Sequence, residues 1–316
     1  MDRRLGLTVP PLGMDLRTAS DLAVEAEGLG YTDLWAAEVS GTDGLAACSA
    51  MGVKTSSARI GVAITPVYSR PPALLAMGAA AAQQASGGRF ALGIGASTPT
   101  IVEGWMGQSF QRPVGRMRET IDFLRRAWAG EKIDHDGTFS ARGFRLETPL
   151  EQPVPIFLAA LGPQMLRLAA GAADGVVLFA TSEEGVRLAR AAVPNKELVA
   201  RLIVVPGGDA AQVHPFAQWM LAPYIAAPGY NPWIARQGFE EEAEAIARLW
   251  NSGDRTGARE AVSERLIEAL VLYGDPARIK ERLESFYEAG LSTPILMLLS
   301  QEGPDALRTA IKDLAP

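Results

Sequence analysis

Two apolar runs at residues 60–64 and 90–94 flank one helical segment, and this arrangement constrains the fold more than any other feature of the chain. Each run is almost continuously apolar, which is typical of a parallel strand covered on both faces. Strands joined by a crossover helix run parallel, so their carboxyl ends lie at the same rim. Because parallel α/β proteins bind ligands at that rim, we expect a site at residues 65–66 and 95–97.

The alternation of strand-like and helix-like segments continues along all 316 residues. Eight strands are predicted, at residues 5–9, 32–37, 59–65, 90–95, 154–160, 175–179, 198–205 and 294–299. Helices are predicted at residues 15–29, 44–54, 72–86, 114–129, 163–172, 183–192, 276–289 and 304–314, with a long helical region after Pro215. An open doubly wound sheet is the alternative. Eight strand–helix units favour an α/β fold closed as a single (β/α)8 TIM barrel domain over residues 1–316.

Two connections exceed the usual short length, so we expect insertions after strands 4 and 7. The first, residues 98–153, contains a predicted hairpin within residues 131–153, and the second spans residues 206–272. Long insertions commonly act as lids or interfaces. We expect Trp105 and the segment 219–233 to shape the substrate pocket.

Charge and composition exclude several classes of partner. The net charge of −6 at pH 7 gives no basic footprint for nucleic acid. The longest apolar-rich run, residues 72–85, is interrupted by polar residues and is too short to cross a bilayer. A single cysteine cannot form an internal disulfide, and the amino terminus lacks the apolar core of a signal peptide. We expect a cytoplasmic protein that acts on a small molecule and has no nucleic-acid or membrane partner.

The strand end at residues 93–98 resembles the start of a dinucleotide-binding fingerprint, but the third glycine is missing. Pro99 is also expected to interrupt any helix that begins there, so a Rossmann site is not predicted. Two interpretations remain for Gly93 and Gly95. They let a flat or phosphorylated ligand approach the backbone, or they fit a crowded barrel interior.

Other candidate residues lie at strand ends or in the insertions. Gly162 precedes a helix whose first amides can hold an anion, although an ordinary strand-to-helix turn has the same pattern. Glu38 follows the second strand. His135 in the hairpin and His214 in a loop are interpreted as surface residues. The sequence contains no Ser/His/Asp order, P-loop or metal-spaced cluster, so no metal site is predicted and a cofactor is expected to carry the chemistry.

Five separated segments follow one known pattern: LWAAEVSGTD, IGVAITPVYSRPPALLA, SGGRFALGIGAS, VEGWMGQSFQRP and ALGPQMLRLAAGAADGVVL. Together they resemble the bacterial luciferase-like family, specifically its coenzyme F420-dependent oxidoreductase branch, over nearly the whole chain. Members are (β/α)8 barrels, commonly homodimers, that bind a flavin or deazaflavin at the carboxyl-terminal rim and pass a hydride between it and a substrate. The resemblance implies an F420-dependent oxidoreductase that works as a reductase on an organic substrate.

The resemblance also implies cofactor-binding residues: Glu38, Ala63, Ile64, Thr65, Gly95, Ala96, Ser97, Leu161, Gly162, Gln164 and Met165. Ala63 and Ile64 correspond to a bulge with a non-prolyl cis peptide behind the deazaflavin ring. Thr65 corresponds to a residue beside that ring. Glu38 corresponds to an acid that contacts the cofactor, and it is the one candidate for a catalytic acid.

Two departures separate the chain from members that oxidise glucose 6-phosphate. Those members have His directly after the acid and Glu three places after the second strand glycine, where this chain has Val39 and Thr98. They also bind the sugar phosphate with a Ser-Gly-Lys run, which is replaced here by residues 181–184. Sugar-phosphate oxidation is therefore not expected. The alternatives are an FMN-dependent monooxygenase that needs a separate reductase, and a degenerate barrel that binds a flavin without catalysis.

Overall fold

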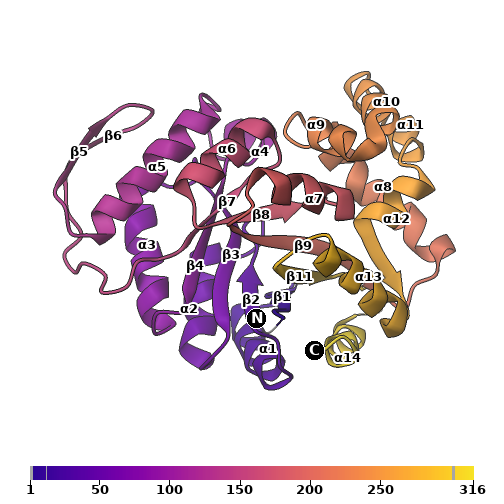
Figure 1. The fold of residues 1–316 in the computed structure, drawn as a ribbon, viewed down its shortest axis with the longest axis horizontal. Coiled ribbons are helices and arrows are strands. Elements are labelled where there is room, and N and C mark those ends of the chain that lie inside the picture. Colours follow the sequence, from indigo (N-terminus) through magenta and orange to yellow (C-terminus); the bar gives the residue numbers. More distant parts are fainter. Residues whose placement is uncertain (1–2, 12, 301–302) are drawn as a thin grey trace.

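Eight parallel strands close into a barrel (Figure 1) in the computed structural model, which describes residues 3–11, 13–300 and 303–316. Going around the barrel, the strands are Gly6–Thr8 (β1), Asp33–Ala36 (β2), Arg59–Pro66 (β3), Phe90–Gly95 (β4), Ile156–Ala159 (β7), Gly175–Phe179 (β8), Glu197–Pro206 (β9) and Thr293–Leu298 (β11). Strand β11 pairs with β1 and so closes the ring. The predicted (β/α)8 barrel is confirmed, and each strand overlaps a predicted one.

Helices pack around the barrel at the positions that the sequence predicts. They are Leu16–Gly28 (α1), Gly44–Lys54 (α2), Pro72–Ala85 (α3), Pro113–Trp128 (α5), Pro163–Ala172 (α6), Glu183–Ala192 (α7), Pro276–Glu288 (α13) and Pro304–Asp313 (α14). Asp15, Asp43 and Asp275 accept backbone N–H bonds at the starts of three of these helices, which is a common N-terminal cap. Within the described ranges, no helix is long and apolar enough to cross a membrane.

The first insertion follows β4 and contains the helix Pro99–Gly104 (α4) and the antiparallel strands Ile133–Asp136 (β5) and Ser140–Phe144 (β6). The hairpin is confirmed. The expectation that Pro99 prevents a helix is wrong, because Pro99 occupies the first turn, where a helix does not use that N–H. His135 lies in this hairpin, but its ring is mostly buried, stacks on Phe139 and bonds to Glu119.

The second insertion follows β9 and forms the orange group of helices in Figure 1. Its elements are Ala210–Ala226 (α8), Asn231–Ile234 (α9), the π-helical turn Ala235–Phe239 (η1), Glu240–Asn251 (α10), Arg255–Glu260 (α11), Glu264–Leu270 (α12) and Val271–Gly274 (β10). Helix α8 begins before Pro215, because Asp209 and Gln212 form a reciprocal capping box. His214 therefore lies in a helix and packs against Tyr273, which contradicts its interpretation as a surface loop residue.

A cluster of charged side chains fills the amino-terminal end of the barrel. Arg59 donates to both carboxylate oxygens of Glu197, at 2.8 and 2.6 Å, and to Oδ1 of the fully buried Asp33 at 2.5 Å. Thr293 donates to Glu197 as well. Burial acts to raise the pKa of Glu197, but these bonds hold it below its ordinary value.

Two aromatic rings fill the middle of the barrel above this cluster. Trp35 and Phe157 pack edge to face with their centroids 5.6 Å apart, and the Arg59 guanidinium lies over both. Gly61 and Gly175 make room for the rings, since a Cβ at these positions would lie 2.4 and 2.3 Å from a ring carbon. The barrel is thus packed at its base and centre, which leaves the carboxyl ends of the strands as its open end.

We expect Arg59→Met to lower the free energy of unfolding by about 3–5 kcal/mol, because it leaves Glu197 without its ion-pair partner and Asp33 with Arg4 alone in the barrel interior. Urea unfolding measures this difference. Arg125→Met is the matched control, since Arg125 pairs with Asp174 at the surface, where an ion pair contributes about 1 kcal/mol or less. Equal losses in the two variants would contradict the role of Arg59.

Candidate active site

A cavity of about 120 Å³ opens at the carboxyl ends of the barrel strands. Its lining residues come from the ends of six strands or the loops after them and from the second insertion: Glu38, Val39, Ala63, Ile64, Ser97, Thr98, Ile101, Ala159, Leu161, Val177, Phe179, Arg201, Tyr224 and Tyr230. Five of the predicted site residues are in this set. The cavity lies at the rim where parallel barrels hold their ligands.

Strand β3 carries a bulge where it reaches the cavity. The pairing with β4 shifts between Val62 and Thr65, and the peptide between Ala63 and Ile64 is cis. The predicted bulge and cis peptide are confirmed. Ala63 and Ile64 line the cavity, whereas Thr65 is fully buried behind it. The bulge therefore presents a small apolar surface to whatever occupies the cavity.

Gly93 and Gly95 on β4 make room for this bulge. A Cβ on Gly93 would lie 2.1 Å from the carbonyl oxygen of Val62, and one on Gly95 would lie 2.7 Å from Cδ1 of Ile64. Neither glycine lines the cavity, so the crowded-interior interpretation accounts for both. Gly95 supports the cavity wall from behind.

Glu38 is held by a network at the rim that buries most of its side chain. Its Oε2 accepts a hydrogen bond from the hydroxyl of Thr65 at 3.0 Å and one from the backbone N–H of Gly44 at 3.3 Å. Its Oε1 forms an ion pair with Arg70, which also pairs with Asp43. Both carboxylate oxygens are thus engaged as acceptors, which suits a fixed anion more than a proton donor. Arg70 and Asp43 were not identified from the sequence.

The loop after β4 contributes Ser97 and Thr98. Ser97 has a positive φ of 63°, a conformation that is uncommon outside glycine and is often found at functional sites. Thr98 caps α4 and lines the cavity. Val39, in the loop after β2, lines the cavity as well. Ala96 is partly buried and packs against the core.

The predicted phosphate-side loop lies next to the cavity, and one member of it, Leu161, lines the wall. Gly162 caps α6 without a side-chain hydrogen bond, so the first amides of α6 are not bonded by a capping side chain. Gln164 is exposed and Met165 is partly buried in the first turn of that helix. A role for these residues in binding stays a prediction.

In the wall opposite the bulge, Tyr224 and Tyr230 lie in the segment 219–233 that was expected to shape the pocket, whereas Phe179 and Arg201 were not identified from the sequence. Phe179, Tyr224 and Tyr230 form an aromatic group whose centroids are 5.4 to 6.1 Å apart. Burial raises the pKa of Tyr230 to about 12. Arg201 completes this wall. An arginine within an otherwise apolar strand was the one available signal, because such a residue needs a partner.

The tryptophans expected to shape the pocket are placed differently. Trp105 and Trp219 are 58% and 56% exposed and do not line the cavity, while Trp233 is buried. The expectation for the segment 219–233 is confirmed, because Tyr224 and Tyr230 within it line the cavity. In the described part of the chain, no group of three or more His, Cys, Asp or Glu residues is arranged to hold a metal ion.

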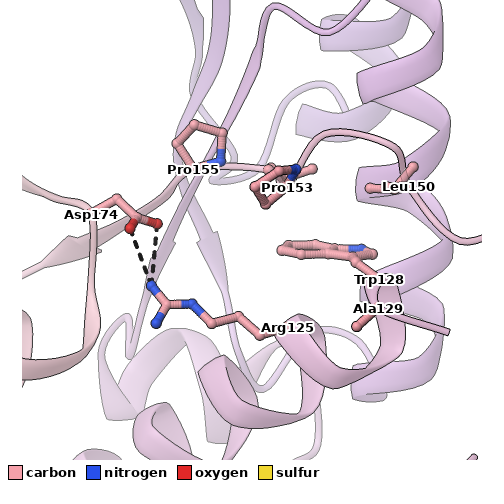
Figure 2. A pocket seen from close by; sticks show the side chains of 8 residues that line it. Arg125, Trp128, Ala129, Leu150, Pro153, Pro155 and Asp174 are labelled. Carbon is pink, nitrogen blue, oxygen red and sulfur yellow. Dashed lines mark hydrogen bonds and ion pairs between the residues drawn. The ribbon is translucent and has the colours of Figure 1, made fainter. Parts of the chain in front are cut away.

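A larger hollow of about 690 Å³ lies at the opposite end of the barrel, beside the start of β7. Figure 2 shows its lining, where Arg125 points toward Asp174 and the Trp128 ring lies beside Pro153. The Asp174 carboxylate also accepts the backbone N–H of Ile156. Its charged groups are therefore paired with each other, and the hollow lies away from the rim where parallel barrels bind ligands.

Comparisons with known proteins agree with this geometry. The sequence model of the luciferase-like monooxygenase family matches residues 3–293. A Mycobacterium tuberculosis protein named as a coenzyme F420-dependent oxidoreductase is 28% identical, with 90% of this chain and 91% of the relative covered. The 5,10-methylenetetrahydromethanopterin reductase of Archaeoglobus fulgidus is 29% identical, with 81% and 80% covered.

Solved structures show the same fold. The coenzyme F420-dependent tetrahydromethanopterin reductase of Methanopyrus kandleri superposes with a TM-score of 0.80 at 21% identity, covering 100% of this chain and 98% of that chain. An F420-dependent secondary alcohol dehydrogenase, solved with an F420-acetone adduct, superposes with a TM-score of 0.78 at 18% identity and the same coverage.

We expect Gly93→Ala to destabilise the protein by about 1–3 kcal/mol, because the new Cβ meets backbone that cannot move without disturbing the bulge. Gly171→Ala on α6 is the matched control. Its Cβ would meet nothing within 4 Å, and alanine favours a helix by up to about 1 kcal/mol. Urea unfolding of both variants measures the difference, and similar effects would contradict the packing role of Gly93.

Proposed function

Since the chain belongs to the luciferase-like monooxygenase family, we propose that it is a coenzyme F420-dependent oxidoreductase that acts as a reductase on an organic substrate. The observation that carries this proposal is the apolar bulge of β3, which faces a cavity at the carboxyl-terminal rim. Relatives named for F420, at 28% identity and below, support the choice of cofactor.

The residues around the cavity fit a flat, mostly apolar ring. Ala63 and Ile64 supply one face, and Ile101, Ala159 and Leu161 add apolar surface beside it. The polar residues that line the cavity are Glu38, Ser97, Thr98, Arg201, Tyr224 and Tyr230. The free amides at the start of α6 suit the phosphate of the cofactor's side chain.

Coenzyme F420, when bound, supplies two-electron hydride chemistry. The bulge would shield one face of the ring, so the substrate must approach from the wall formed by Phe179, Tyr224 and Tyr230. Reduction of an electrophilic carbon takes up one hydride and one proton. The tyrosine hydroxyls and water are the available proton donors at this wall.

The departures at Val39 and Thr98 support the reductive direction of this proposal. Oxidation of an alcohol requires a base to remove the hydroxyl proton, and neither of these side chains can act as one. Glu38 is occupied by Arg70, Thr65 and Gly44. A reductase needs no such base, because the proton comes from a donor or from solvent.

Three further points from the sequence remain proposals: a single domain over the full length, a cytoplasmic location and a homodimer. Leu74 and Met77 on α3 support the dimer, because they are about half exposed and form an apolar pair that a second copy would cover. Sedimentation of the purified protein tests the oligomeric state.

We expect F420 to bind at least about tenfold more tightly than FMN, a difference of about 1.4 kcal/mol. Fluorescence titration of the purified protein with each cofactor measures both dissociation constants. Equal or tighter binding of FMN would contradict the assignment and favour the alternative of an FMN-dependent monooxygenase. Binding of F420 without turnover of any carbonyl, imine or activated alkene would favour the alternative of a barrel that binds without catalysis.

We expect Glu38→Gln to weaken F420 binding about tenfold while it changes the melting temperature little. The amide keeps the shape of the side chain but removes the charge that holds Arg70 at the rim, and charged hydrogen bonds contribute about 1.5–3 kcal/mol. Glu119→Gln is the control, because Glu119 accepts similar bonds from Thr138 and His135 away from the cavity. Unchanged affinity and turnover in Glu38→Gln would remove Glu38 from the site.

A further inference from the structure

Arg201 is a cation without a counterion in the wall of the cavity. Its side chain extends from β9 into the barrel mouth, and its Nε is buried without a hydrogen-bond partner. Its Nη2 lies 2.8 Å from the sulfur of Met297, which is a weak acceptor. Burial lowers the pKa of Arg201 below its ordinary value, which reflects how poorly the charge is solvated there.

No carboxylate of the described residues forms an ion pair with Arg201. Glu38, the acid that lines the same cavity, is already paired with Arg70. The groups that do surround Arg201 are aromatic: its guanidinium carbon lies 5.6 Å from the Phe179 ring centroid, and Tyr224 and Tyr230 lie close enough to interact with its charge. Aromatic faces stabilise a cation only in part.

Arg201 lies on the side of the cavity away from the bulge of β3, where the cofactor ring is proposed to bind. The bulge of β3 and the ends of β4 and β7 form one side of the cavity, whereas Arg201, on β9, belongs with the residues of β8, α8 and the α8–α9 connection on the other. A molecule that lies between the bulge-bound ring and this second wall would place an anionic end against the guanidinium. The charge that the protein lacks would thus come from the substrate.

We propose that Arg201 determines substrate specificity by pairing with a carboxylate, so that the substrates are small organic acids with a planar or apolar body. The body would lie among Phe179, Tyr224 and Tyr230, and the forked guanidinium can bind both carboxylate oxygens. The reduction of such an acid rests on the proposed function. The binding of a carboxylate by Arg201 does not depend on the proposed function.

Benzoate is a suitable probe, with benzamide as a neutral molecule of nearly the same shape. Calorimetric titration of the full-length protein is expected to show that benzoate binds and that benzamide binds at least about tenfold more weakly. Arg201→Met should raise the dissociation constant of benzoate about tenfold or more, and Arg201→Lys should retain part of the affinity because it keeps the charge without the fork. Equal binding of benzoate and benzamide to the wild type would overturn the proposal.

The matched control is Arg116→Met. Arg116 also lies over aromatic rings, 4.8 Å from the centroid of Tyr68, but it is outside the cavity. This variant should bind benzoate as the wild type does. A loss of benzoate affinity in Arg116→Met as large as that in Arg201→Met would overturn the proposal, because the effect would then be general.

The stability of the ligand-free protein gives a second readout. A buried charge without a partner destabilises a fold, so Arg201→Met should melt at the same temperature as the wild type or at a higher one. A lower melting temperature together with unchanged benzoate affinity would assign Arg201 a structural role and overturn the proposal.

Titration with F420 separates this proposal from the proposed function. If the wild type does not bind F420, the proposed function fails, while the benzoate comparison still decides the role of Arg201. If Arg201→Met weakens F420 binding and leaves benzoate binding unchanged, Arg201 serves the cofactor, and the specificity proposal is overturned.

Discussion

The pairing of Arg59 with Asp33 and Glu197 is the constraint on which the rest of the barrel depends. These residues lie on three strands, and β9 is on the far side of the ring from β2 and β3. Without Arg59, Glu197 has no ion-pair partner and Asp33 keeps only Arg4, although a buried ion needs a counterion. The cluster therefore fixes the closure of the barrel and seals its base, which leaves the carboxyl-terminal rim as the open end.

Strand β9 carries a second charged residue that faces the interior, Arg201, four residues after Glu197. Glu197 at the sealed end is fully paired, whereas Arg201 at the open end has only a sulfur and aromatic rings around it. On this strand, the buried charge at the sealed end has a counterion. The buried charge at the open end, which a ligand can reach, has none among the described residues. A departure of this kind at a rim cavity is a sign of function.

Features that depend on local sequence pattern, such as the barrel strands, could be predicted. Features that depend on contacts between distant segments, such as the aromatic wall, could not be predicted residue by residue. Continuous apolar runs identified the barrel strands, and the carboxyl-end rule identified the rim where Ala63, Ile64 and Ser97 lie. The segment 219–233 was expected to shape the pocket, but the individual roles of Tyr224 and Tyr230 were not predicted, because the contact of a helical insertion with β8 leaves no periodic signal. Pro99 was misjudged, because proline ends helices and also begins them.

Buried hydrogen bonds between uncharged groups fix the second insertion to the barrel. Gln237 accepts bonds from the N–H and hydroxyl of Ser182 and donates to the carbonyls of Ala180 and Trp233. The loop after β8 thus holds η1 and, through it, the aromatic wall. A wall anchored in this way favours recognition by the shape and charge of a preformed pocket over closure of a lid around the substrate.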